Sequence, residues 1–164
     1  MKQKLRRLLV ICILGLLTIG LLFGCCAEGK PGIEAAEEYL NRDLDDLQRI
    51  IQWMQSTKYK SIAFWRNEDF MLAELEHLSI DESIRPTLNR LYKNGYQFIS
   101  MRIEENTVVF EYWSRTIGDR SCGLAYVLDG ENLPEVQFMT ESEPLSVKGW
   151  YYYFSDYEEW RVSH

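Results

Sequence analysis

Two neighbouring segments of alternating polar and apolar residues constrain the fold of this chain more than any other feature. Their apolar members are Ile99, Met101 and Ile103, then Val108, Phe110 and Tyr112. A period of two is that of a strand with one buried face. A tight turn at Glu105-Asn106 would pair Ile103 with Val108 and set all six residues on one face. We therefore expect an antiparallel hairpin, since a slip of one residue would break that agreement.

Further strands are expected around this hairpin. Residues 59–65, YKSIAFW, are rich in aromatic and β-forming residues. Residues 122–128 alternate as a third strand, which the turn residues Asp129-Gly130 end. Residues 136–140 predict a short edge strand, and GWYYYF at 149–154 predicts a last strand with aromatic residues on both faces.

Two helices are expected before the hairpin. Residues 33–54 carry an apolar stripe at three- and four-residue steps, and the acidic residues Asp43, Asp45 and Asp46 fall off that stripe, toward solvent. Residues 84–94 predict a second helix, which Asp81 or Ser83 would cap and Asn94-Gly95 would end. Residues 68–80 stay open, because their helix propensity is good but the run is short.

Strands that follow helices indicate an α+β fold. We expect an antiparallel β-meander of about four to five strands with two helices packed on one face. Residues 33–164 fit a single acidic domain in length.

The N-terminus has the pattern of an export signal. Four basic residues among the first seven precede a run, residues 8–23, of apolar residues, Gly and Thr. Such a run enters the bilayer while the basic residues stay on the cytoplasmic side. The alternative is an uncleaved single-span anchor over residues 8–27, since about 20 apolar residues cross a bilayer.

The edge of this run, Leu22-Phe23-Gly24-Cys25, resembles the lipobox of bacterial lipoprotein precursors. In that family the cysteine thiol receives a diacylglycerol and the signal is cut just before it. The resemblance implies that residues 1–24 are removed, that Cys25 is the lipidated N-terminus, and that 25–32 form a flexible tether. It also implies a location on the outer face of the bacterial cell membrane, or at the outer membrane of a diderm cell.

Charge narrows the choice of partners. The chain has 18 basic and 25 acidic residues; the signal holds four of the basic ones, which leaves 14 against 25 and a formal net charge of −11. Such a surface repels nucleic acid. The expected partners are the membrane, through the N-terminal lipid, and another envelope or exported protein.

No pattern in the sequence predicts catalysis. Cys122 has the parity of the apolar residues around it, so we expect it in the core rather than as a nucleophile. A disulfide between Cys26 and Cys122 stays open. The two histidines are His77 and His164, and no motif for a phosphate or a metal is present, so no cofactor and no metal site is expected. The acidic residues of the 156–159 segment are expected in a solvated loop.

Four aromatic residues are the candidate binding residues: Phe98, Trp113, Tyr151 and Tyr153. Strict alternation places them on the sheet face opposite the helices. There they could form a binding surface, or they could be ordinary cross-strand pairs or be covered by residues 65–80. Aromatic side chains bring a large contact area at low entropy cost.

The function favoured by the sequence is therefore a non-enzymatic binding or protective role at the cell envelope, of which an immunity-type lipoprotein that neutralises a basic toxin is one form. The alternatives are an envelope hydrolase with an unfamiliar site and a single-span membrane protein. A hydrolase would show a cleft in which His77 meets an acid and a hydroxyl or thiol, whereas a binder would show a flat aromatic patch.

Overall fold

The fold comes from a computed structural model that describes residues 29–66, 71–73, 76–78, 81–115 and 120–163. The chain divides into two units, Met1–Lys30 and Pro31–His164. Residues 1–28, which include the lipobox, Cys26 and the alternative anchor, lie outside the described residues. Within the described ranges, no helix has the length and apolar character needed to cross a membrane.

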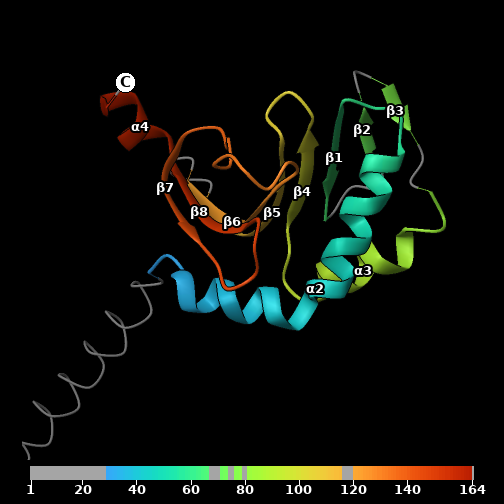
Figure 1. Ribbon diagram of the computed structural model, residues 1–164, viewed down its shortest axis with the longest axis horizontal. Coiled ribbons are helices and arrows are strands. Elements are labelled where there is room, and N and C mark those ends of the chain that lie inside the picture. The colour runs from blue at the N-terminus through green and yellow to red at the C-terminus, as the bar shows by residue number, and fades with distance from the viewer. Residues whose placement is uncertain (1–28, 67–70, 74–75, 79–80, 116–119, 164) are drawn as a thin grey trace, which may run out of the picture. The chain divides into compact units, whose positions relative to one another are not determined.

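In the described residues, one antiparallel sheet of eight strands forms the body of the second unit, with the strand order β3-β2-β1-β4-β5-β6-β8-β7 (Figure 1). The strands are β1 Ser61–Trp65, β2 Met71–Ala73, β3 Glu76–Leu78, β4 Phe98–Arg102, β5 Thr107–Arg115, β6 Arg120–Val127, β7 Met139–Pro144 and β8 Trp150–Asp156. The α+β class is confirmed, while the expected number of four to five strands is too low.

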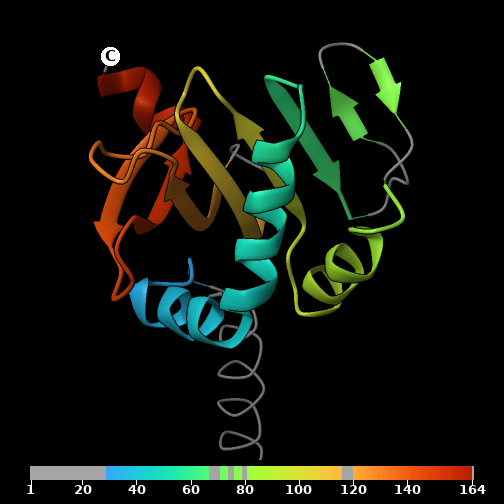
Figure 2. The same ribbon diagram turned by 45° about the vertical axis from the view of Figure 1, so that its right-hand side comes forward.

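Three helices accompany the sheet in the described residues, where two were expected: α2 Ile33–Ser56, α3 Arg85–Lys93 and α4 Tyr157–Ser163. Helix α2 bends as it follows the sheet, as the views in Figures 1 and 2 show. The third helix, α4, contacts β7 and β8. It occupies the segment predicted as a solvated loop, because the Asp156 carboxylate accepts the Glu159 N–H at 3.1 Å and caps its first turn.

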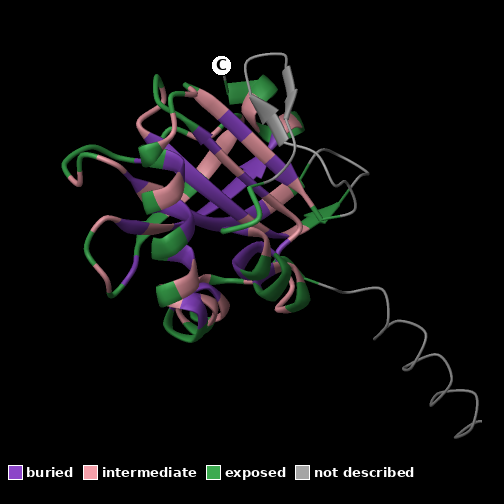
Figure 3. Cartoon of the chain, turned by 90° about the vertical axis from the view of Figure 1, so that its right-hand side faces the viewer, coloured by how far each residue is buried: buried purple, intermediate pink, exposed green. Residues whose placement is uncertain are grey.

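The main core lies between helices α2 and α3 and one face of the sheet, which we call the helix face. Alternate strand residues supply its sheet side, among them Phe64, Ile99, Phe110, Leu124 and Trp150. The opposite face, which we call the far face, carries a smaller buried cluster of Val109, Ala125 and Tyr153. Figure 3 shows the buried segments crossing the strands and the exposed segments on the helices and loops.

The helices begin and end largely as predicted. Helix α3 has no side-chain cap, however, because its N-cap is Ile84, so the predicted capping by Asp81 or Ser83 is wrong. Gly95 follows α3 with a φ of 113°, which the predicted stop requires. Asp43 is buried rather than solvated: it accepts hydrogen bonds from Arg42 at 2.6 Å and from the Asn94 side chain at 2.7 Å, which joins α2 to the end of α3.

The predicted hairpin forms, but in a register that differs by two residues. Met101 pairs with Val108 and Ile99 with Phe110. Four residues, 103–106, make the turn, and Asn106 has a φ of 52°. A shift of two keeps every residue on its face. Five of the six predicted core residues are therefore buried, and Ile103 alone leaves the set, at 49% exposed.

Two parts of the sheet depart from a simple meander. The open segment 68–80 contains β2 and β3, a hairpin that pairs with β1 despite its helix-forming composition. At the other end, the last strand β8 lies between β6 and the edge strand β7. The chain after β6 therefore passes the position of β8, forms β7 and returns. The long connection 128–138 that this order requires carries residues across the far face.

Candidate functional site

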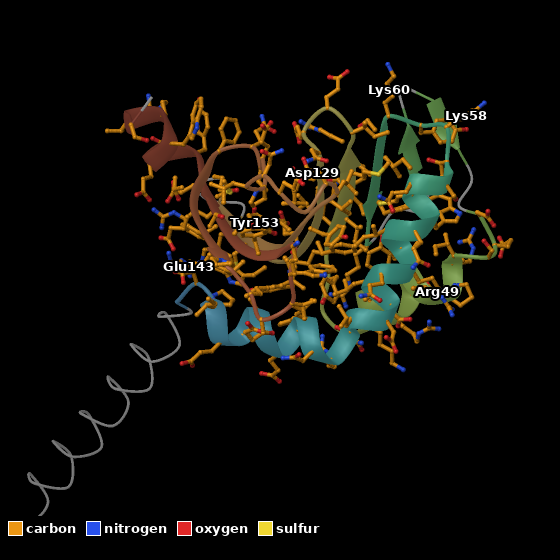
Figure 4. All side chains as sticks on the ribbon, in the orientation of Figure 1. Arg49, Lys58, Lys60, Asp129, Glu143 and Tyr153 are labelled. Carbon is orange, nitrogen blue, oxygen red and sulfur yellow. The ribbon has the colours of Figure 1, made fainter. Side chains whose placement is uncertain are left out.

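A cleft of about 240 Å3 opens on the far face of the sheet. Strands β4, β5, β6 and β8 form its floor, and residues 136–138 form its roof. Its lining residues are Phe98, Ser100, Arg102, Glu105, Val109, Glu111, Ser121, Val136, Gln137, Phe138, Tyr153 and Ser155. Figure 4 labels Tyr153 in the curved part of the sheet, on strand β8, which lies between β6 and β7.

The floor is organised by a single row of paired residues across four strands. Phe98 on β4 pairs with Glu111 on β5, Glu111 with Gly123 on β6, and Gly123 with Tyr153 on β8. Neighbouring strands lie about 4.8 Å apart. The row thus places an aromatic residue on each side of a carboxylate, with a residue that has no side chain between the carboxylate and the tyrosine.

Gly123 allows this arrangement because β5 approaches it closely. A Cβ on Gly123 would lie 2.2 Å from the Phe110 carbonyl oxygen and 2.9 Å from the Glu111 Cα. The register between β5 and β6 shifts at the same point, where Glu111 pairs with Gly123 but Trp113 pairs with Cys122. Tyr112 is the extra residue of a β-bulge, which bends β5 over the glycine.

The bulge corrects the predicted position of Trp113. Beyond the extra residue the alternation inverts, so Trp113 shares the face of its partner Cys122 and packs on the main core, 6.5 Å from the Phe154 ring. The assignment of Trp113 to the far face is therefore wrong. Tyr112 stays on the helix face and stacks on Tyr39 of α2 at 4.2 Å.

The other three aromatic candidates lie on the far face. Phe98 and Tyr153 line the cleft. Tyr151 packs beside it on the cluster of Val109, Ala125 and Tyr153. The geometry brings Phe98 and Tyr153 to the same site, and their binding role stays a prediction. The surface they form is a roofed cleft rather than the flat patch expected of a binder. Phe98 also packs on its cross-strand partner Trp65, with 4.9 Å between the ring centroids, so the ordinary cross-strand pairing weighed as an alternative holds for Phe98.

Hydrogen bonds hold the roof at both ends. The Glu135 N–H donates to the Thr107 hydroxyl at 3.0 Å, which in turn donates to the Glu105 carbonyl at 2.8 Å. The Ser155 hydroxyl donates to the Gln137 carbonyl at 3.1 Å, and the Asp156 N–H donates to the Phe138 carbonyl at 3.1 Å. These bonds tie the roof to the β4–β5 turn and to β8, so the cleft is preformed.

Phe138 takes an unusual backbone conformation in this roof, with a φ of 58°. A side chain with a Cβ adopts that region at a cost. Its ring packs against Tyr157 at 4.8 Å and Trp160 at 5.2 Å, both on α4. Helix α4, which the sequence did not predict, therefore supports the roof of the cleft.

Three polar groups of the floor interact with one another: Glu111, Ser121 and Tyr153. Burial raises the pKa of Glu111, while hydrogen bonding with Ser121 and Ser114 lowers it in part. Burial also raises the pKa of Tyr153 well above that of an ordinary tyrosine, and the nearby Glu111 charge raises it further. Tyr153 is therefore a neutral phenol at neutral pH, beside a carboxyl group that ionises less readily than usual.

Arg102 and Glu105 stand at the other end of the cleft. They form an ion pair with 2.6 Å between Nη1 and Oε1. Arg102 is four residues along β4 from Phe98, which is about 13 Å. Its charge is thus held by Glu105 and lies well away from Glu111.

Glu111 and Ser121 are site residues that sequence reasoning missed. Glu111 lies between two apolar core residues of a strand. In such an alternating pattern, an acidic residue is expected to face solvent. One signal was available: Gly123 interrupts the alternation of its strand, and a glycine inside a strand marks a bulge or a close approach of another backbone.

Of the groups weighed for catalysis or metal binding, the described Cys122 and Asp156 do not line the cleft. Cys122 is buried on the helix face, as predicted, with its sulfur 3.9 Å from the Pro31 carbonyl oxygen. His77 lies in β3, three strands from β4, and His164 lies outside the described residues. Asp156 pairs with Arg120 at 2.6 Å. Among the described residues, no three acidic, cysteine or histidine side chains converge as metal ligands.

Comparison with known proteins gives no relative. No family model matches the chain, and neither a curated protein nor a solved structure is similar to it.

Proposed function

We propose that this chain is a bacterial lipoprotein, anchored through Cys25 to the outer face of the cell membrane, whose folded unit binds a protein partner at the envelope without catalysing a reaction. Protection against an exported toxin, as by an immunity-type lipoprotein, is one form of this role. The anchor rests on the resemblance of Leu22-Phe23-Gly24-Cys25 to a lipobox.

The observation that carries the binding role is the preformed cleft on the far face. Two of the aromatic residues selected from the sequence, Phe98 and Tyr153, line it together with a partly desolvated carboxyl group. Pockets that combine apolar walls with a few convergent polar groups are the usual binding sites of proteins. The Cys122 thiol, which the hydrolase alternative would use as a nucleophile, lies on the opposite face of the sheet.

The anchor is tested by metabolic labelling. The full chain and two variants, Cys25→Ala and Cys26→Ala, are expressed in a bacterium that is fed radiolabelled palmitate. Label on the parent and on Cys26→Ala, with none on Cys25→Ala, is the expected result. Equal labelling of the two variants, or a parent that keeps its precursor mass, would contradict the assignment of Cys25 and favour the single-span alternative.

The binding role is tested by crosslinking in cells. A photoreactive phenylalanine analogue replaces either Gln137, which is exposed and lines the cleft, or Gln48, which is exposed on α2. An adduct of defined mass from position 137 and none from position 48 is expected, and mass spectrometry then identifies the bound protein. Adducts from position 48 alone would place the binding surface on the helices and refute the role of the cleft.

A further inference from the structure

The cleft holds an acidic group that the described side chains leave without a counter-charge. The groups that affect the pKa of Glu111 are its burial and the hydroxyls of Ser121 and Ser114, and no cation is among them. The ion pairs formed by the described side chains do not include Glu111. Removing a carboxylate from water costs free energy unless a partner balances it. A ligand that brings a positive charge would supply this balance.

The cleft does not supply that charge itself. Arg102 is the cationic residue of the described lining, and its guanidinium is already bound to Glu105 at 2.6 Å. The charges of Arg102 and Glu105 cancel, so the remaining charge of the lining is the negative charge of the Glu111 carboxylate. The site is therefore complementary to a cation at its Glu111 end.

The walls beside Glu111 suit an organic cation better than a hydrated metal ion. Phe98 is the cross-strand neighbour of Glu111 and lines the same cleft, with Tyr153 two strands away. Aromatic faces attract ammonium and guanidinium groups within about 6 Å of the ring centroid. An alkyl chain that leads to the charge would lie along Val109 and Val136, which also line the cleft.

The size of the cleft limits what can enter it. Its volume of about 240 Å3 is below the range of roughly 300–1,000 Å3 typical of sites for drug-sized ligands. One side chain of a protein fits this space better than a larger free molecule. The mature chain also carries a formal net charge of −11 after the four basic residues of the signal are removed, and an acidic protein attracts basic proteins at long range.

We infer that the cleft receives a lysine or arginine side chain of a protein partner, whose cationic end pairs with Glu111 between Phe98 and Tyr153. This inference rests on the binding role proposed above and adds the chemistry of the contact. The partner presents a basic side chain on a surface segment, and the preformed roof receives it without rearrangement.

The inference is tested by titrating the full chain, in a nonionic detergent, with single-residue probes. The probes are N-acetyl-lysine amide and N-acetyl-arginine amide, with N-acetyl-norleucine amide as the neutral analogue and n-butylamine as the free amine. Chemical-shift changes at the Ser121 and Tyr153 backbone amides report binding in the cleft. One of the two cationic residues is expected to bind about tenfold or more tightly than norleucine amide, as charged hydrogen bonds require.

Two variants assign the charge effect to Glu111. Glu111→Gln keeps the shape of the side chain and is expected to remove the advantage of the cationic probes. Glu143→Gln removes the same charge from an exposed position on β7 and is expected to leave the affinity unchanged. Equal losses in both variants would make the effect one of net charge and overturn the inference.

The pH dependence gives a third readout. A bound cation favours the ionised carboxylate, so affinity is expected to fall as pH falls through the raised pKa of Glu111, and Glu111→Gln is expected to abolish this fall. Among the other charged or titratable groups around the cleft, Tyr153 stays neutral, the paired Arg102 and Glu105 lie at the other end, and Glu135 is exposed ahead of the roof. Glu105→Gln should keep the pH dependence.

The outcomes separate this inference from the proposed function. The inference would be overturned if norleucine amide bound as tightly as the cationic probes, or if no probe bound. An adduct from position 137 in cells would still support the binding role in either case. Binding of n-butylamine as tight as that of lysine amide would indicate a free amine and overturn a protein as the source. Tight cationic binding that Glu111→Gln abolishes, together with the position-137 adduct, is the result expected.

Discussion

Replacing Gly123 by alanine tests the packing that shapes the cleft floor. The new methyl group would lie 2.2 Å from the Phe110 carbonyl oxygen and 2.9 Å from the Glu111 Cα. Both contacts are with backbone, which cannot turn aside as a flexible side chain does. Overpacking of an interior costs about 1–3 kcal/mol, and the short backbone contacts place this variant at the upper end, at about 3 kcal/mol.

Urea unfolding of the full chain in nonionic detergent, followed by the fluorescence of its five tryptophans, measures this loss. With a slope of about 2 kcal/mol per molar urea, the midpoint should fall by about 1.5 M. Gly29→Ala is the matched control, because nothing lies within 4 Å of its Cβ position and its midpoint should not change. A Gly123→Ala midpoint within about 0.3 M of the parent would refute a rigid close approach of β5 and β6 at the bulge.

Three further variants test other parts of the structure. Trp113→Ala should lower the free energy of unfolding by about 2 kcal/mol, since the side chain packs on the main core. Phe98→Ser should instead weaken probe binding, with a smaller loss of stability. If Trp113→Ala weakened binding and Phe98→Ser caused the larger loss of stability, Trp113 would belong to the binding face after all. Glu111→Gln should raise the urea midpoint at pH 7 and leave it unchanged at pH 4. The folded-state pKa of Glu111 is raised, so ionisation of this carboxyl opposes folding once the pH exceeds the pKa of the unfolded state. A midpoint that falls at pH 7 would contradict this. Asp46→Asn should lower the midpoint slightly at pH 7 by removing the ion pair with Arg90. This pair lowers the pKa of Asp46, so its contribution to stability is present above the ordinary aspartate pKa of about 3.9 and is lost as pH falls through the lower folded-state pKa. A difference in midpoint that does not change with pH would refute this.

Local periodicity was sufficient for the elements that bury one face. The stripe of α2, the α3 stop at Gly95 and the alternating strands β4, β5, β6 and β8 all follow from which residues are apolar and how far apart they stand. The register of the β4–β5 hairpin was harder. A slip of two residues preserves every face, so the apolar pattern could not distinguish a two-residue turn from the four-residue turn that forms.

The remaining errors come from long-range packing. The hairpin of β2 and β3 overrides the helix propensity of its sequence because β1 offers it a partner. Trp113 changed faces because a single extra residue, Tyr112, inverts the alternation beyond it. The cleft could be predicted only in part: Phe98 and Tyr153 followed from alternation, whereas Glu111 became a site residue through the roof, which depends on the order of β7 and β8.

The position of β8 between β6 and β7 also sets the order in which the domain is completed. Because a chain is synthesised from its N-terminus, β6 and β7 are made before the strand that joins them. One edge of β6 and both edges of β7 therefore stay unpaired until residues 150–156 are made. Those same residues bring Tyr153 and the anchor for the roof. The cleft is thus completed only when the last strand has paired, so any ligand that requires the cleft could bind only to chains whose sheet is complete.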